Sequence, residues 1–134
     1  MKRLLALLCC AAVSVPAMAA DWEVFSKDEK LTVYYSPSTV RKGKNVARAW
    51  VLVDYVELQV RILGPSNHKA YSSRLELIEF DCAEDRRSSL QTSYRSGPMG
   101  SGDVIDTVTH VAKSWGYDSP GTVGAALLEQ VCGK

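Results

Sequence analysis

The residue types that most often carry catalysis or bind metal ions are few and scattered in this sequence. It has two histidines, His68 in a polar loop and His110 in an apolar stretch, and neither lies near a serine in a hydrolase pattern such as Gly-x-Ser-x-Gly. No HExxH, CxxC, EF-hand or phosphate-loop motif is present. His68, His110 or Met99 could serve as an axial haem ligand. Nothing in their spacing favours this role over that of an ordinary solvated loop residue. We therefore expect no catalytic residue, no metal site and no cofactor.

A basic cluster is the strongest candidate for ligand binding. It comprises Arg41, Lys42, Lys44 and Arg48, around a glycine at position 43 that suits a tight turn. At the tip of a predicted hairpin, these side chains could contact a sulfated glycan or an acidic protein. The alternative is a solvated turn, which is what charged hairpin tips usually are. The binding interpretation requires Arg48 to lie on the same side as the tip.

A second charged run contains both signs. It consists of Asp81, Glu84, Asp85, Arg86 and Arg87. One arginine could pair with Asp81 or Glu79 and fix a turn, whereas the functional alternative is a fork that recognises a carboxylate. Mixed charge produces no steering field, so the structural interpretation is favoured.

The overall composition is that of a small globular protein. The chain has 134 residues, of which 46% are hydrophobic and 23% are charged. This is too apolar for a disordered chain and too short for several domains.

The first 19 residues have the layout of a secretory signal peptide. Lys2 and Arg3 precede an apolar run of about a dozen residues, and Ala17-Met18-Ala19 offers a cleavage site. The run is shorter than the roughly 20 residues that span a bilayer. Cleavage after Ala19 would leave a single domain over residues 20–134. Cys9 and Cys10 lie inside the run, where a lipid-modified cysteine does not fit, so we expect export without a lipid anchor.

Removal of this segment leaves a nearly neutral domain. Without Lys2 and Arg3 there are 14 basic and 15 acidic residues. This balance does not attract the domain to nucleic acid or to an anionic membrane. No later apolar run is long enough to predict a transmembrane segment.

Two cysteines remain after the predicted cleavage, Cys82 and Cys132. An even pair in an exported protein predicts a disulfide bond, because the compartment is oxidising. Two buried free thiols are the alternative.

Alternating hydrophobicity predicts about six strands. They occupy residues 22–25, 30–35, 46–62, 70–82, 87–96 and 103–111. The first half of 46–62 is apolar on both faces and the second half alternates, which indicates a long strand that becomes half-exposed. Leu75 and Leu77 point opposite to Ile78 and Phe80, which indicates a bulge near Leu77 or burial of both faces.

The pattern after residue 119 is helical. Thr122 suits an N-cap, and Gly124, Leu127, Leu128, Val131 and Cys132 fall on one helix face before Gly133. We therefore predict an α+β fold, an antiparallel meander with one C-terminal helix tied to it by Cys82 and Cys132. Such a sheet leaves two edges exposed, so a homodimer is a reasonable expectation.

The order of several short motifs resembles the surface-adhesin protein E family. The matching positions are Tyr34-Tyr35, 36–41, 43–46, 49–52, Ser72-Ser73, 79–82, Arg86, Met99-Gly100, Gly102, Trp115, 120–122, Leu127 and Val131-Cys132. The resemblance implies a small exported bacterial protein in which a disulfide ties a helix to an antiparallel sheet, with Cys82 and Cys132 at those positions. It also implies an adhesin for host-matrix proteins that can dimerise and has been linked to haem.

Two functions follow from these observations. The first is an adhesin-like binding module, without catalytic activity, that recognises an extracellular-matrix protein or glycan at the cell surface. The second is a periplasmic structural or interaction protein with no host ligand, which the lack of a lipid-anchor motif favours.

Overall fold

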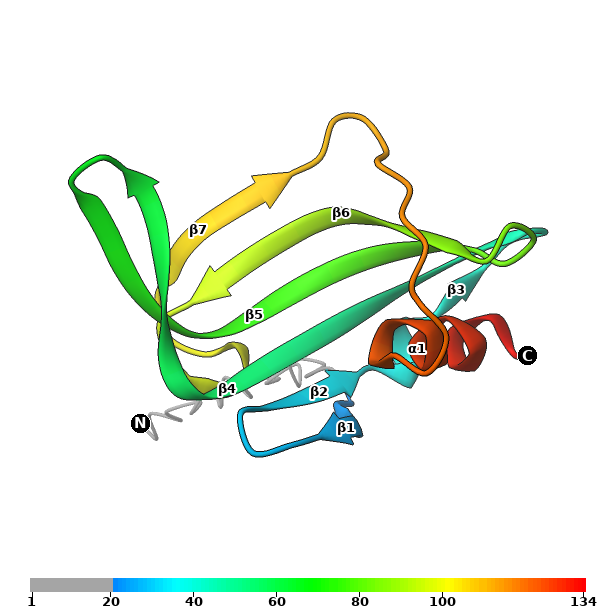
Figure 1. The fold of residues 1–134 in the computed structure, drawn as a ribbon, viewed down its shortest axis with the longest axis horizontal. Coiled ribbons are helices and arrows are strands. Elements are labelled where there is room, and N and C mark those ends of the chain that lie inside the picture. Colours follow the sequence, from blue (N-terminus) through cyan, green and yellow to red (C-terminus); the bar gives the residue numbers. More distant parts are fainter. Residues whose placement is uncertain (1–20) are drawn as a thin grey trace, which may run out of the picture.

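The structure is a computed structural model that describes residues 21–134, so the predicted signal peptide lies outside the described residues. In this described part of the chain, one antiparallel sheet carries a single α-helix on one face (Figure 1). The strands are β1 (Glu23–Lys27), β2 (Leu31–Tyr35), β3 (Arg41–Lys42), β4 (Val46–Gly64), β5 (Asn67–Asp81), β6 (Arg86–Arg95) and β7 (Val104–Thr109). The helix is α1 (Val123–Cys132), and 3-10 turns occupy Pro37–Thr39 and Pro98–Gly100.

The strands follow one another across the sheet with little crossing. Their order is β1-β2-β4-β5-β6-β7, and β3 pairs separately with the first residues of β4. The predicted α+β meander is therefore confirmed. The count rises from six strands to seven because the tip at 41–42, predicted as part of a turn, forms a two-residue strand against Arg48 and Ala47.

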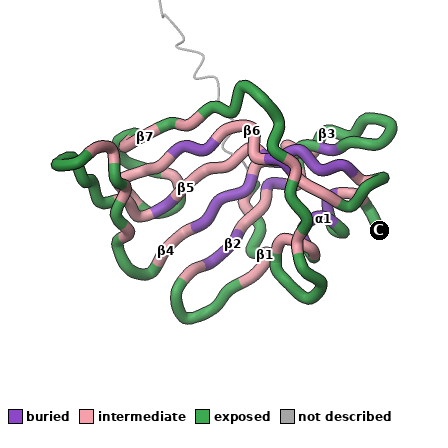
Figure 2. Tube along the Cα trace, turned by 45° about the horizontal axis from the view of Figure 1, so that its top comes forward, coloured by how far each residue is buried: buried purple, intermediate pink, exposed green. Residues whose placement is uncertain are grey.

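Alternation along β4 separates the two faces of the sheet. Ala47, Ala49, Val51 and Val53 point toward α1, and this side is called the helix face. Together with Ile78 and Phe80 they pack against Leu127, Leu128 and Val131. The buried segments accordingly run through the middle strands (Figure 2). The opposite side, called the outer face, has a smaller apolar centre at Leu52, which is also fully buried.

Both predicted ends of the helix are present. The Thr122 side chain accepts a hydrogen bond from the Ala125 backbone N–H at 3.3 Å, which satisfies one of the free donors of the first turn. Gly133 follows the last turn with φ of 72°, a left-handed conformation that glycine adopts without a Cβ penalty.

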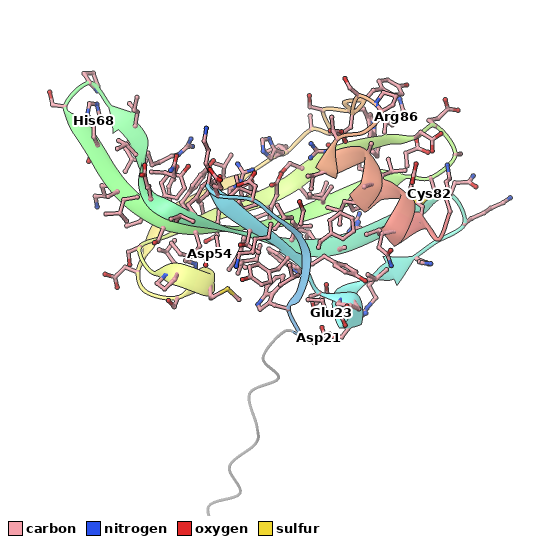
Figure 3. All side chains as sticks on the ribbon, turned by 60° about the horizontal axis from the view of Figure 1, so that its bottom comes forward. Asp21, Glu23, Asp54, His68, Cys82 and Arg86 are labelled. Atoms are coloured by element: carbon pink, nitrogen blue, oxygen red, sulfur yellow. A yellow bond between two sulfur atoms is a disulfide. The ribbon has the colours of Figure 1, made fainter. Side chains whose placement is uncertain are left out.

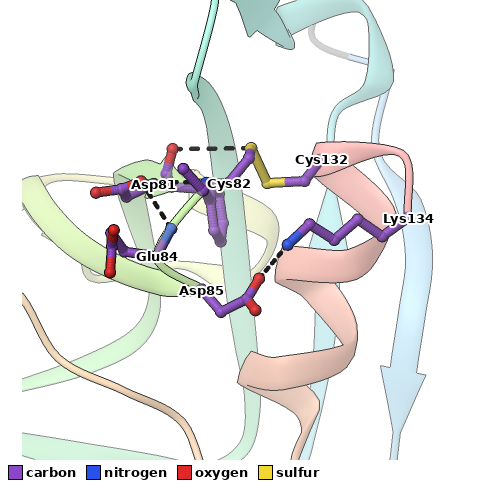
Figure 4. Close-up of a disulfide and its surroundings, with 8 residues drawn as sticks. Asp81, Cys82, Glu84, Asp85, Cys132 and Lys134 are labelled. Atoms are coloured by element: carbon purple, nitrogen blue, oxygen red, sulfur yellow. Dashed lines mark hydrogen bonds and ion pairs between the residues drawn. A yellow bond between two sulfur atoms is a disulfide. The ribbon is translucent and has the colours of Figure 1, made fainter.

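The disulfide bond between Cys82 and Cys132 is confirmed (Figure 4). It joins the residue after β5 to the last residue of α1, with Cα atoms 5.6 Å apart. Close by, Lys134 forms an ion pair with Asp85 in the β5–β6 turn. The C-terminal end of the helix is therefore attached to the same end of the sheet by a covalent bond and an ion pair.

At the other end of the sheet, β4 and β5 continue as a two-stranded hairpin, here called the arm (residues 56–71). Between the pairs Asp54↔Ser73 and Gln59↔Tyr71 the register shifts, because β4 has extra residues there. The arm projects away from the sheet, with His68 near its tip (Figure 3). The Arg61 side chain, on the polar side of the arm, forms an ion pair with Asp106 on β7. The polar side of the arm therefore faces the rest of the sheet.

The arm corrects one expectation about β4. The alternating second half predicted that its apolar side chains would be covered and its polar ones exposed. Instead, the side chains of Val56, Leu58, Val60 and Ile62 are all more than 60% exposed. The reason is that the hairpin extends past its neighbours β2 and β6, so none of the elements in residues 21–134 covers its apolar side. These four residues are called the arm stripe.

The irregularity predicted near Leu77 is also present. Pairing between β5 and β6 shifts between Leu77 and Ile78, where Gln91 and Ser89 are their partners and Leu90 is skipped. The extra residue belongs to β6, so β5 itself keeps its alternation. Strand β7 ends at Thr109, so His110 lies just after it and not within a strand as predicted.

Candidate binding surface

The structure divides the predicted basic cluster between the two faces of the sheet. Arg41 pairs with Arg48 across β3 and β4, so both side chains lie on the outer face. Lys42 pairs with Ala47 and lies on the helix face, beside Gly133 at the C-terminal end of α1, where the helix dipole favours a cation. Lys44 is exposed in the turn. Of the residues at the tip, Arg41 shares a face with Arg48, as the binding interpretation requires, whereas Lys42 does not.

Arg48 has an ionic partner inside the protein. Its Nε lies 2.6 Å from Oε2 of Glu79, a carboxylate that is almost fully buried on β5. The Nζ of Lys113, from the loop between β7 and α1, lies 2.5 Å from the other oxygen of Glu79. Burial alone would raise the pKa of Glu79, but hydrogen bonds and charge from Lys113 and Arg48 outweigh it and hold this pKa below its usual value.

A second carboxylate on the outer face, that of Asp81, also has partners inside the protein. Asp81 accepts hydrogen bonds from the backbone N–H groups of Glu84 and Ala83 and from Nε of Arg86. The bond from Glu84 makes the largest contribution to lowering the pKa of Asp81. The Arg86 guanidinium also lies over the Trp115 ring, 4.8 Å from its centroid. The structural interpretation of this charged run is therefore confirmed for Arg86 and Asp81.

The remaining arginine of that run does not offer a free carboxylate fork. Nε and Nη2 of Arg87 donate to both oxygens of Asp118, at 2.6 and 3.0 Å. This pair closes the loop that precedes α1 against the edge of β6, where Arg87 and Gly116 form a backbone bridge. The arginine fork that could have recognised a carboxylate ligand is therefore occupied by Asp118.

Four cations thus converge on the outer face from three parts of the sequence. They are Arg41, Arg48, Arg86 and Lys113, called the basic patch. Arg48 and Lys113 keep about half of their side-chain surface exposed, although each contacts Glu79. Glu79 and Asp81 together carry two negative charges, so the patch has positive charge in excess even after both carboxylates are paired.

Sequence reasoning identified only half of this patch. Arg41 and Arg48 belong to the local basic cluster, whereas Lys113 lies 65 residues beyond Arg48. The signal that could have found it is the glutamate at position 79, because a buried carboxylate opposite Arg48 needs partners. Nothing in the spacing of Arg86 or Lys113 shows which face they occupy.

The two histidines lie in different parts of the structure. His68 lies near the tip of the arm (Figure 3), opposite Ile62. The backbone N–H of His110 donates to the carbonyl of Leu90. Within residues 21–134, no group of three His, Cys, Asp or Glu side chains has a geometry suited to a metal ion. Over the same residues, the structure contains no helix with the length and apolar character needed to span a membrane.

Comparison with known proteins gives a family and a fold. The family model for surface-adhesin protein E matches residues 22–133. Comparison with curated protein sequences finds no match. Among solved structures, protein E from non-typeable Haemophilus influenzae superposes with a TM-score of 0.60 at 12% identity, covering 88% of this chain and 80% of that chain. A second structure of Haemophilus influenzae protein E superposes with a TM-score of 0.58 at 12% identity, covering 84% of this chain and 83% of that chain.

Proposed function

Because the chain belongs to the surface-adhesin protein E family, we propose that it is an exported, non-catalytic binding protein that recognises an anionic glycan or an acidic protein surface. Residues 1–19 would direct export and residues 20–134 would form the binding domain. The observation that carries the ligand class is the basic patch, in which cations from separate segments gather on one open face of the sheet.

The geometry of the patch suits an extended anionic ligand. Its carboxylates are already paired at 2.5 to 3.0 Å, and Glu79 is buried beneath its partners, so an approaching ligand meets exposed cations before acids. Arg41 is the member without an acidic partner among the described residues, since its hydrogen bonds go to the backbone carbonyls of Ser38 and Val40. Exposed cations of this kind give salt-dependent binding, because screening weakens their attraction over about 10 Å at 0.1 M salt.

Binding to immobilised heparin, used as a sulfated-glycan probe, tests the proposal. We expect retention that weakens as NaCl rises, and a loss of at least fivefold in affinity for Arg41→Ser. The matched control is Lys69→Ser, which removes the same charge from an exposed site on the arm. Equal losses for the two variants, or no binding at low salt, would refute a site at the patch.

The cellular location decides between the two biological roles. The family describes surface adhesins, which supports a ligand outside the cell and makes a host-matrix protein or glycan the first ligand to test. Protease treatment of intact and lysed cells separates the roles. Loss of the protein from intact cells fits an adhesin, whereas protection until lysis would favour a periplasmic interaction protein.

A further inference from the structure

Arg74, on β5, differs from the other arginines that the structure describes. Each of the others donates at least one hydrogen bond; these are Arg41, Arg48, Arg61, Arg86, Arg87 and Arg95. The Nε of Arg74 is buried and has no hydrogen-bond partner within residues 21–134. A buried donor without an acceptor is costly, because it has lost its water without replacement.

The neighbouring carboxylate does not satisfy Arg74. Nη2 of Arg74 lies 4.0 Å from Oε2 of Glu76, too far for a hydrogen bond. The arginines of the other described ion pairs approach their carboxylates within 3.0 Å. About a third of the Arg74 side chain remains exposed, so its terminal nitrogens can be reached from solvent.

Arg74 opens into a pocket on the helix face. The pocket has a volume of about 330 Å³ and lies between the first turn of α1 and the sheet. Its apolar lining is Leu31, Val33, Val51, Val53, Ile78, Val123 and Leu127. Of the other charged groups there, Arg87 is held by Asp118, and Asp28 accepts backbone N–H groups of Lys30 and Leu31. Glu76 also lines the pocket, and its carboxylate is the one that lies 4.0 Å from Arg74. Arg74 is therefore the polar group of this lining that is free to take a new acceptor.

We propose that this pocket binds a carboxylate attached to a compact apolar group. The carboxylate pairs with the guanidinium of Arg74, in place of its long contact with Glu76, and the apolar group lies against Val51 and Val53. An arginine fork and a carboxylate form charge-assisted hydrogen bonds, which are stronger than neutral ones. The volume is at the lower end for ligand sites, so it fits one branched side chain with its own carboxylate, as at the end of a peptide. This site is separate from the basic patch, which lies on the opposite face.

Titration with N-acetyl-leucine, followed by amide chemical shifts of the folded protein, tests the proposal. We expect saturable shifts at residues around Val53 and Glu76. N-acetyl-leucinamide has the same apolar group without the charge and should bind at least tenfold more weakly. Equal affinity for the acid and the amide, or no saturable shift with the acid, would overturn the proposal.

Two variants place the site at Arg74. Arg74→Met should weaken binding of N-acetyl-leucine at least tenfold, whereas Arg95→Met, an arginine on the outer face of β6, should leave it unchanged. Glu76→Gln removes the competing carboxylate and should tighten binding severalfold, a gain that loss of folding does not produce.

Unchanged affinity in both Arg74→Met and Glu76→Gln would overturn the assignment. Heparin binding by the basic patch should be unaffected by all three, so failure of one proposal is distinguishable from failure of the other.

Discussion

The Nζ of Lys113 lies 2.5 Å from Oε1 of Glu79, which ties the long loop before α1 to the middle of the sheet. Arg48 reaches the second oxygen of the same carboxylate from β4. Glu79 therefore connects two segments that lie far apart in the sequence. Because it is almost fully buried, it depends on both cations to remain ionised.

This arrangement predicts acid sensitivity. The pKa of Glu79 is held below its ordinary value of 4.5 in the folded protein. A lowered folded pKa gives stability that is complete above the unfolded pKa and is lost as the pH falls through the folded value. We therefore expect the contribution of Glu79 to the free energy of unfolding, measured by urea titration, to be constant above pH 4.5. Below pH 4.5 this contribution should decline.

The Glu79→Gln variant isolates this contribution from other carboxylates. Asp21, Asp28 and Asp81 also have lowered pKa values, and they titrate equally in both proteins. We expect the variant to be less stable by about 1 kcal/mol at pH 7, since both cations are half exposed to water. The difference should shrink as the pH falls below 4.5. A constant difference from pH 7 to pH 3 would show that Glu79 does not carry the effect.

The disulfide predicts a large loss of stability on removal. Cys82 and Cys132 are 50 residues apart in the sequence, and chain-entropy reasoning assigns about 4 kcal/mol to closing such a loop. We expect Cys82→Ser with Cys132→Ser to lower the free energy of unfolding by that order. The unreduced wild-type domain, unfolded in denaturant, should show no titratable thiol among residues 21–134. Two thiols would contradict the bond.

The strands and the helix were predictable because their signals are local. Alternation fixes which side of β4 faces α1, and Thr122 and Gly133 mark the helix ends through their own backbone preferences. The two cysteines of the predicted mature domain left one intramolecular pairing. These features depend on residues that are close in the chain or few in number.

The arm and the basic patch were less accessible from the sequence. An apolar alternation looks the same whether or not another element covers it, so the exposure of Val60 and Ile62 depends on where β2 and β6 end. The position of Lys113 depends on the path of a loop without periodicity. Arg74 gave no signal at all, because the lack of a hydrogen bond is a property of tertiary packing.

The backbone and surroundings of Gly100 predict that this position does not accept a side chain. Its φ is +73°, and a Cβ there would lie 3.2 Å from atoms of Leu52 and Leu75 on the outer face. A left-handed backbone costs a residue with a Cβ about 1–2 kcal/mol, and the close contacts add to this. We expect Gly100→Ala to lower the thermal midpoint clearly. Gly116→Ala is the control, since a Cβ there meets nothing within 4 Å. Equal midpoints for the two variants would contradict the close fit at Gly100.

The arm stripe predicts weak self-association of the protein. Its four branched side chains are each more than 60% exposed and lie on one side of the arm. Two copies placed stripe to stripe would bury these side chains alone, far fewer than the roughly 20–30 residues a side of a stable interface. A second copy fits because a C2 contact lets the stripe cover itself, and the free strand edges of the arm allow further pairing.

Sedimentation equilibrium over a range of concentrations measures this association. We expect a monomer–dimer equilibrium that strengthens with salt up to moderate concentrations, because the contact is apolar. Leu58→Lys with Ile62→Lys should leave only monomer, since lysines facing each other would repel. Val24→Lys with Val111→Lys places the same added charge on two exposed valines outside the arm, and this variant should dimerise as the wild type does. A wild-type protein that stays monomeric at the highest concentrations would contradict self-association through the stripe.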